Sequence, residues 1–206
     1  MEAAAAAFDK KKNARKIPEA LVYETMDGQP YFRKGYKSVL NRTKKVEDIM
    51  GSSTLQGEIH MYLLSLLLRH VDLENFTVHS NEAGLHISKG NNLAGDILLY
   101  DRKTMTSEKI NKFYSSVPPL LAIEIDIRID LEKESDFRYV NRKIRKLLDF
   151  GVEKVIWVLT ETKQVIIAKR NAPSGQFMDW NQDVEIHPGL LFNIGHYLDT
   201  RNIIVE

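Results

Sequence analysis

The segment LLAIEIDIRI, residues 120–129, sets the interpretation of the whole chain. Apolar and charged side chains alternate from residue 123 onward, and successive side chains of a β-strand point to opposite faces of a sheet. The isoleucines therefore share one face, which predicts a core-facing strand, and Glu124, Asp126 and Arg128 share the other face. The apolar residues that precede the alternation favour a strand deep within the sheet rather than at its edge.

Carboxylates on one face of a central strand are costly unless a cation lies close to them. Burial and mutual repulsion raise the pKa of each carboxyl group, and a divalent metal ion or a lysine offsets this effect. One more carboxylate, Asp96, opens the hydrophobic segment DILLY, residues 96–100. A solvated face on which Arg128 pairs with its neighbours explains the same spacing, so the alternation alone leaves both interpretations open.

The rest of the chain predicts a mixture of helices and strands. Apolar residues recur at helical spacing over residues 54–70, after Ser52 and Ser53, and over residues 136–150, before Gly151. A helical connector is expected over residues 38–50, and a long polar loop over residues 101–117. Strands are expected over residues 20–25 and 30–33 (a hairpin around Asp27-Gly28), 76–79, 85–87, 97–100, 155–159 and 164–169, with a short strand after residue 184.

This order of elements predicts an α/β or α+β domain over residues 18–206, with a central mixed sheet flanked by helices. Residues 1–17 are rich in alanine and lysine and are expected to form a flexible basic arm. Arms of this composition are more often solvated than bound to phosphate.

The composition excludes several classes of protein. The chain has 206 residues, of which 43% are hydrophobic and 28% charged, which predicts a packed globular domain. Its 29 Lys and Arg residues balance 28 Asp and Glu residues, so a nucleic-acid partner would need a local basic patch. The chain has no cysteine, which excludes disulfides and thiolate zinc sites, and its six histidines lack zinc-site spacing. The apolar runs are too short for a membrane span and the N-terminus is a poor signal peptide, so a soluble, cytoplasmic protein is expected.

Three of these features resemble a bacterial protein family. They are Asp96 at the start of a strand, Glu124 within an apolar strand, and a lysine-bearing helix that runs into LLDFGVEKVIWV, residues 147–158. This arrangement resembles the Uma-type family of putative restriction endonucleases, within the PD-(D/E)XK nuclease superfamily. The resemblance covers about residues 18–195 and is densest over residues 120–169. It implies a restriction endonuclease-like fold with a metal-dependent phosphodiesterase core.

The resemblance also implies roles for individual residues. Asp96 and Glu124 correspond to metal ligands for Mg²⁺, with Mn²⁺ as a substitute, and Asp126 is a further candidate ligand. The sequence departs from the superfamily pattern in two places, because Gly95 replaces a proline and Asp126 stands where a lysine is expected. In the Uma-type family the lysine comes from the following helix, where Lys143 occupies the corresponding place.

Helix geometry offers a partial, independent check on Lys143. At about 100° per residue, Lys143 lies at the flank of the apolar stripe, from where its stem can lie on the core and its ammonium can reach the sheet. Arg142 and Lys146 are expected to point to solvent. An ordinary flanking lysine is the alternative interpretation of Lys143. The expected stripe comprises Phe137, Val140, Ile144, Leu147 and Leu148.

Further candidates come from the first long helix and from basic residues. Gln56 and Glu58 lie at the edges of the apolar stripe of that helix; Gln56 matches the family position better, and Glu58 is the better metal ligand. DNA contacts are expected from the basic arm and the loop over residues 101–117, and their strength should fall with salt. The helix-borne DNA contacts are expected from Arg142, Arg145 and Lys146.

The resemblance therefore implies a Mg²⁺-dependent endonuclease that hydrolyses DNA. Asp96, Glu124 and also Asp126 would hold the metal ion, and Lys143 would orient the attacking water. A second hypothesis is a catalytically inactive nuclease-fold protein that serves as a DNA-binding or protein-interaction module, because Asp126 occupies the position of the lysine. A third is an enzyme of the same fold that acts on RNA or branched DNA. A homodimer is expected only by analogy with nucleases that cut both strands.

Overall fold

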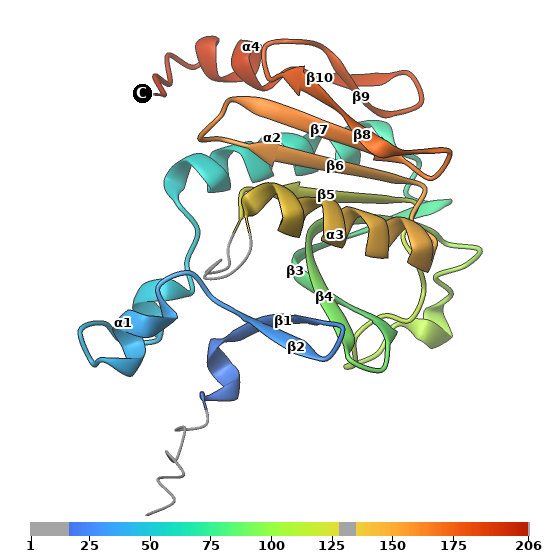
Figure 1. The fold of residues 1–206 in the computed structure, drawn as a ribbon. Coiled ribbons are helices and arrows are strands. Elements are labelled where there is room, and N and C mark those ends of the chain that lie inside the picture. Colours follow the sequence, from blue (N-terminus) through green and yellow to red (C-terminus); the bar gives the residue numbers. More distant parts are fainter. Residues whose placement is uncertain (1–16, 128–134, 206) are drawn as a thin grey trace, which may run out of the picture.

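An eight-stranded mixed sheet forms the centre of the computed structural model, which describes residues 17–127 and 135–205 (Figure 1). Its strands are β1 (Val22–Met26), β2 (Gln29–Phe32), β3 (Phe76–Ser88), β4 (Asn91–Asp101), β5 (Leu121–Ile125), β6 (Lys154–Leu159), β7 (Gln164–Lys169) and β8 (Ala172–Asp179). They follow the order β2-β1-β4-β5-β6-β7-β8, and β3 also pairs with β4. The pair β5–β6 is parallel and the other pairs are antiparallel.

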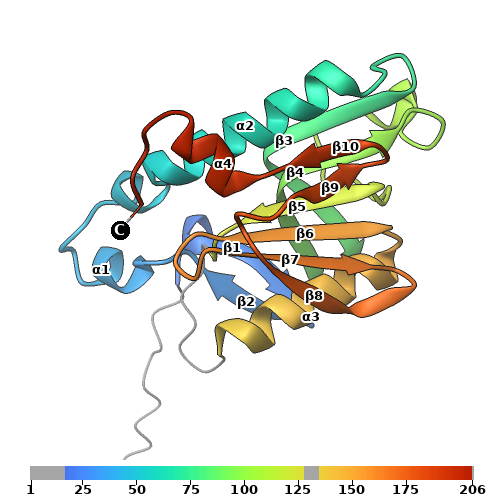
Figure 2. The ribbon, with the colours of Figure 1, turned by 90° about the horizontal axis from the view of Figure 1, so that it is seen from above.

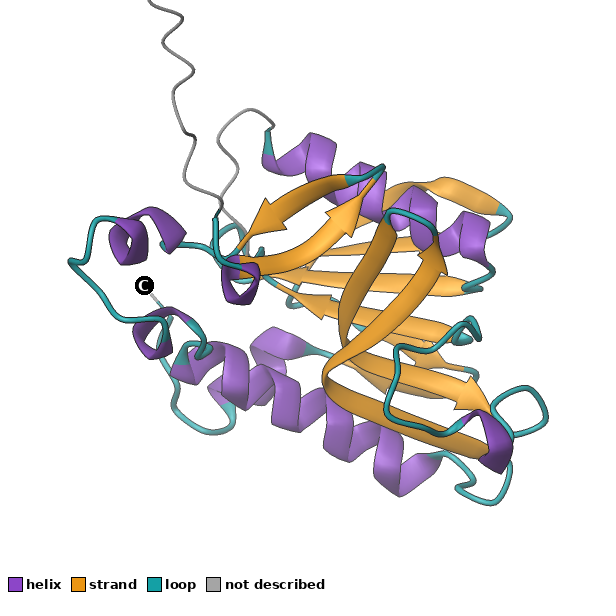
Figure 3. Cartoon of the chain, turned by 90° about the horizontal axis from the view of Figure 1, so that it is seen from below, coloured by secondary structure: helices purple, strands orange, loops and turns teal. Residues whose placement is uncertain are grey.

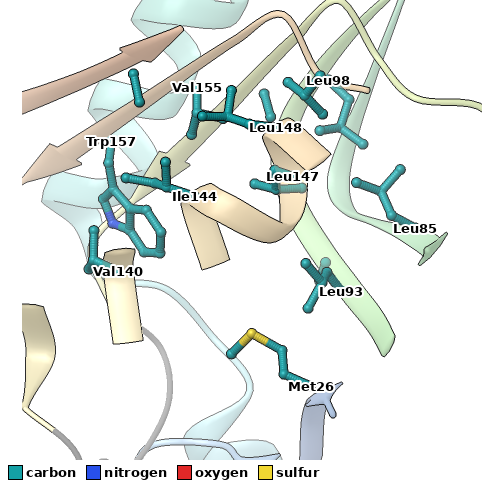
Figure 4. Close-up of a cluster of buried hydrophobic side chains, with 14 of the residues drawn as sticks. Met26, Leu85, Leu93, Leu98, Val140, Ile144, Leu147, Leu148, Val155 and Trp157 are labelled. Carbon is teal, nitrogen blue, oxygen red and sulfur yellow. The ribbon is translucent and has the colours of Figure 1, made fainter. Parts of the chain in front are cut away.

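Two long helices lie on opposite faces of this sheet. Figures 2 and 3 show the sheet between α2 (Thr54–His70) and α3 (Asp136–Phe150). Ile123 and Ile125 of β5 belong to the core that α2 covers, and Ala122 belongs to the core under α3. Figure 4 shows the apolar side of α3 packed toward Trp157 and Val155 of β6. Because side chains alternate along a strand, Glu124 shares the α3 face with Ala122.

Shorter elements complete the described chain. The helices are α1 (Tyr36–Leu40) and α4 (Ile194–Asp199), with 3-10 turns at Glu19–Leu21, Glu47–Ile49 and Ser107–Lys109. A small second sheet pairs β9 (Val184–His187) with β10 (Leu190–Phe192), and its apolar side chains join the core under α2. In the part of the chain that the structure describes, no helix is long and apolar enough to cross a membrane.

The segment over residues 120–129 forms the predicted buried strand, but the strand is shorter than expected. All five residues of β5 are buried, and the strand ends at Ile125. Asp126 has a φ of 59°, in the left-handed region, so the strict alternation stops there. The prediction that Asp126 shares a face with Glu124 is therefore wrong. Arg128 and residue 129 lie outside the described residues, as do residues 1–16 of the predicted arm.

The helix over residues 136–150 is confirmed, and its buried stripe needs one correction. Phe137 is 62% exposed, whereas Tyr139 and Lys143 are each 1% exposed. The buried face is rotated toward Tyr139 and Lys143 because the β1–β2 hairpin packs against that side of α3, where Glu24 meets Tyr139.

Two strands are longer than the sequence predicted. The segments expected at residues 76–79 and 85–87 form the single strand β3, which continues through a bulge between Ser80 and Ala83. Asn81 and Glu82 within the bulge both have positive φ angles, which explains why their sequence suggested a break. β4 also begins six residues before the expected strand over 97–100. β8 was not predicted, since most of its residues are exposed and carry no alternating apolar pattern.

Candidate functional site

Three carboxylates and one lysine meet between the sheet and α3. This carboxylate–lysine cluster consists of Glu24 on β1, Asp96 on β4, Glu124 on β5 and Lys143 on α3. Among the described residues these four are the charged side chains that are buried, at 1% to 3% exposure. Charged residues are almost never buried without partners, so their convergence is a specific feature of the fold.

The register of the sheet places Asp96 beside Glu124. In the antiparallel pair β4–β5, Ile97 lies opposite Ile123, so the next position brings Asp96 opposite Glu124. The Oδ2 atom of Asp96 accepts a hydrogen bond of 2.8 Å from the backbone N–H of Ile125. This bond fixes the Asp96 carboxylate at the carboxyl end of β5.

Lys143 reaches the same point from the helix above the sheet. Its ammonium donates to the backbone oxygen of Ala94 at 2.8 Å and pairs with Glu24 Oε2 at 3.0 Å and Glu124 Oε2 at 3.1 Å. Two of its three N–H donors therefore make hydrogen bonds, whereas its contact with Glu24 is an ion pair, because the Oε2 atom of Glu24 has no hydrogen-bond partner among the described residues. The ammonium also lies 5.5 Å from the ring centroid of Trp157, within the range of cation–π attraction.

Glu24 is the member of the cluster that the sequence analysis missed. Its Oε1 atom accepts a hydrogen bond of 2.5 Å from the hydroxyl of Tyr139, and its Oε2 atom faces Lys143. The available signal was one carboxylate within the otherwise apolar strand segment ALVYETM, residues 20–26. Nothing in that segment identifies Lys143 as its partner, which lies 119 residues away.

The electrostatics of the cluster favour a proton or a cation at Glu124. Burial raises the pKa of Glu124 to about 8; Lys143 lowers it, and the charges of Asp96 and Glu24 raise it. Burial lowers the pKa of Lys143, but the charges of Glu124 and Glu24 more than offset this effect and raise its pKa well above the ordinary value. The ammonium therefore stays charged.

The donor set of the cluster fits a hard divalent cation. The Oε1 atom of Glu124 is buried and has no hydrogen-bond partner among the described residues. With every group ionised, three carboxylates and one ammonium carry a net charge of −2, which a divalent ion would balance. Mg²⁺ commonly takes one or two protein carboxylates and fills its other positions with water and phosphate oxygens. No group of three or more His, Asp or Glu side chains in the described ranges is arranged to hold a metal ion.

Of the other predicted site residues, the structure places Asp126 and Glu58 away from the cluster and Gln56 near it. The carboxylate of Asp126 accepts hydrogen bonds of 2.7 and 2.8 Å from the backbone N–H and the hydroxyl of Thr160, outside the cluster. Gln56 lies near the carboxyl end of β5, with its amide nitrogen 3.5 Å from the backbone oxygen of Ile125. Glu58 instead accepts from the hydroxyl of Tyr197 at 2.6 Å and so faces α4.

Two of the basic residues expected to reach DNA contact the β1–β2 hairpin instead. Arg142 donates to the hydroxyl of Tyr31 at 2.6 Å, and Lys146 pairs with Asp27 at 2.6 Å. The prediction that both point to solvent is wrong, because the hairpin packs along α3 and covers them in part. Arg145, the third basic residue of α3 expected to reach DNA, is exposed.

A cavity of about 930 Å³ adjoins the cluster at the carboxyl end of β5. Gln56, Asp126 and Ile127 line one side of it, and Val140, one helical turn before Lys143, lines another. Basic side chains also border it, namely Arg33, Lys34 and Lys44. The cluster itself is buried and does not line this cavity, which borders its neighbours in the chain, Asp126 and Val140.

Comparison with known proteins identifies the fold. No protein-family model matches the chain, and no curated protein matches its sequence. The chain is similar in structure to a protein from Anabaena variabilis ATCC 29413 described as a putative nuclease belonging to DUF820, with a TM-score of 0.63 and 13% identity over 85% of this chain and 89% of that one. This likeness confirms the predicted fold class, a mixed sheet flanked by helices in a nuclease-like fold.

Proposed function

We propose that the chain is a metal-dependent nuclease that hydrolyses DNA phosphodiester bonds at the carboxylate–lysine cluster. The observation that carries the proposal is the meeting of Lys143 with Glu124, at 3.1 Å, beside Asp96. The cluster thereby combines two carboxylates that could bind a metal ion, from β4 and β5, with one cation that could stabilise the transition state, from α3. The fold shared with a protein described as a putative nuclease supports the same function, although a fold alone does not fix a substrate.

The proposed mechanism assigns each side chain one task. Asp96 and Glu124 would hold Mg²⁺ through carboxylate oxygens. The bound ion would polarise a phosphoryl oxygen and lower the pKa of a coordinated water. Lys143 would orient the attacking water and offset the charge that develops on the phosphate. Two of its N–H groups already donate to Ala94 and Glu124, which leaves the third to bind water or phosphate.

Metal binding is the first prediction to test, because it requires no knowledge of the substrate. Calorimetric titration of Mn²⁺ and Mg²⁺ is expected to show saturable binding to the wild type and none to Asp96→Asn or Glu124→Gln. Asp126→Asn is the matched control and is expected to bind normally, because the Asp126 carboxylate lies on Thr160. Supercoiled plasmid and single-stranded DNA would then be tested for cleavage in the same buffers.

A catalytically inactive module is the second candidate. Its support is the enclosure of the buried Lys143 ammonium by Ala94, Glu24 and Glu124, together with the presence of Asp126 where the superfamily pattern has a lysine. If the protein binds DNA but takes up no metal ion, either alone or in the presence of DNA, this candidate would be favoured over the nuclease.

Two neighbouring basic residues of α3, Arg145 and Lys146, are expected to have different roles, one in DNA binding and the other in folding stability. Arg145→Ala is expected to weaken DNA binding and to lower the slope of log affinity against log salt by about one, because an exposed arginine would contact phosphate. Lys146→Ala is expected to cost about 0.2–1 kcal/mol of folding stability through its contact with Asp27. Binding titrations at several salt concentrations and thermal unfolding measure the two effects. A larger loss of affinity in Lys146→Ala than in Arg145→Ala would contradict this assignment.

A further inference from the structure

We propose that Glu24 is a positioning residue that fixes the ammonium of Lys143 against Glu124, which makes the β1–β2 hairpin part of the active site. The proposal rests on the function proposed above and assigns a role to a residue that this function does not use. Glu24 touches neither of the two metal-ligand candidates in the hydrogen bonds of the described residues; its contacts are to Lys143 and Tyr139.

The need for such an anchor follows from the chemistry of lysine. Four flexible carbons separate the ammonium from the helix, so α3 alone does not fix the ammonium. Its position is set by hydrogen bonds to Ala94 and Glu124 and by the ion pair with Glu24. A metal ion would draw on the oxygens of Glu124, which leaves the backbone of Ala94 and the carboxylate of Glu24 as the contacts independent of the metal.

Glu24 is itself held rigidly. Its side chain is fully buried, and the hydroxyl of Tyr139 donates to the oxygen that does not face Lys143. Tyr139 and Lys143 are four residues apart on α3 and therefore share one helical face, so Glu24 bridges them. Tyr139 also packs against Tyr31 of β2, with ring centroids 5.5 Å apart, which ties the bridge to the hairpin.

The docking of the hairpin on α3 determines where Glu24 stands. The contacts of Arg142 with Tyr31 and of Lys146 with Asp27 continue along the helix from the Glu24–Tyr139 bond. A role in stability alone accounts poorly for a second buried carboxylate on Lys143, because buried ion pairs are weak contributors to stability.

Side-chain NMR of protein labelled with ¹⁵N-lysine tests the positioning without any need for activity. The hydrogen-bonded, buried ammonium of Lys143 is expected to give a slowly exchanging signal, assigned by its absence in Lys143→Met. Glu24→Ala is expected to lose this signal. Glu24→Gln should keep it, since an amide oxygen of the same size can still lie against the ammonium, and Asp27→Asn should keep it as a hairpin control. An unchanged signal in Glu24→Ala would overturn the proposal, whether or not the protein cleaves DNA.

Kinetics and metal titration provide the functional half of the test. Glu24→Ala is expected to lower kcat about 100-fold, the cost of a catalytic group displaced by about 1 Å, with KM and Mn²⁺ affinity unchanged. Glu24→Gln should recover most of this loss, and Tyr139→Phe should fall between Glu24→Ala and the wild type.

Full kcat in Glu24→Ala, or loss of Mn²⁺ binding in Glu24→Gln, would reject a positioning role. A wild type that neither binds Mn²⁺ nor cleaves DNA would instead refute the proposed function, while the NMR result would still decide the role of Glu24.

Discussion

Replacing Lys143 with methionine is expected to lower DNA cleavage by about 100- to 1,000-fold, the usual cost of losing one donor to a developing negative charge. Mn²⁺ binding should remain, because Asp96 and Glu124 keep their carboxylates. The variant should also lose about 3–5 kcal/mol of folding stability, since it leaves buried Glu24 and Glu124 without their cation. Single-turnover cleavage, calorimetry and urea unfolding measure the three effects separately.

A double variant separates the chemical effect from the folding effect. Glu24→Gln combined with Lys143→Met removes both charges of a buried ion pair, so its stability should return toward that of the wild type. Its cleavage should remain as low as that of Lys143→Met alone. If either variant cleaved DNA at the rate of the wild type, Lys143 would be an ordinary flanking lysine, the alternative interpretation that its helix position allows.

Glu124→Gln is expected to change function and stability in opposite directions. It should abolish metal binding and cleavage, yet stabilise the metal-free protein at neutral and higher pH. The pKa of Glu124 is about 8 in the folded protein against an ordinary value of 4.5, so the folded state keeps a proton that the unfolded chain releases between these values. The stability that this group contributes is complete below pH 4.5 and is lost as the pH rises to about 8.

The variant lacks this titration, so its advantage over the wild type should grow with pH. The difference in free energy of unfolding is expected to rise between pH 5 and 8, with a slope of at most about 1.4 kcal/mol per pH unit. Urea unfolding in the presence of a chelator measures it. Glu74→Gln, at an exposed position, is the matched control and should show a flat difference. A flat difference for Glu124→Gln as well would show that its carboxyl group is not desolvated in solution.

Elements whose pattern is local were predictable from the sequence. α3 begins and ends at the predicted residues because its apolar spacing and the Gly151 that follows it belong to one segment. β5 was identified from its alternation, and the hairpin from Asp27-Gly28. The prediction that Asp126 shares a face with Glu124 failed because the backbone of Asp126 is left-handed. An aspartate can adopt this conformation, and the alternating sequence does not indicate it.

The composition of the site was predictable only in part. Asp96, Glu124 and Lys143 were predicted as site residues from the family resemblance, and the structure brings them together. Glu24 was missed because its partners, Tyr139 and Lys143, are more than 110 residues away in the chain, and an isolated carboxylate in a strand has many ordinary explanations. Arg142 and Lys146, which were expected to contact DNA, instead contact Tyr31 and Asp27 of the same hairpin.

The sequence is therefore sufficient to establish the fold class, the central strand and the lysine-bearing helix, because helical and strand periodicity are properties of a single segment. The docking of the β1–β2 hairpin on α3 follows from the folded chain as a whole. That docking buries Lys143, supplies Glu24 as its second carboxylate and rotates the buried face of α3 from Phe137 toward Tyr139. The physical reason is that burial, and with it the pKa of Glu124 and the charge of the cluster, depends on which distant segments exclude water from a side chain.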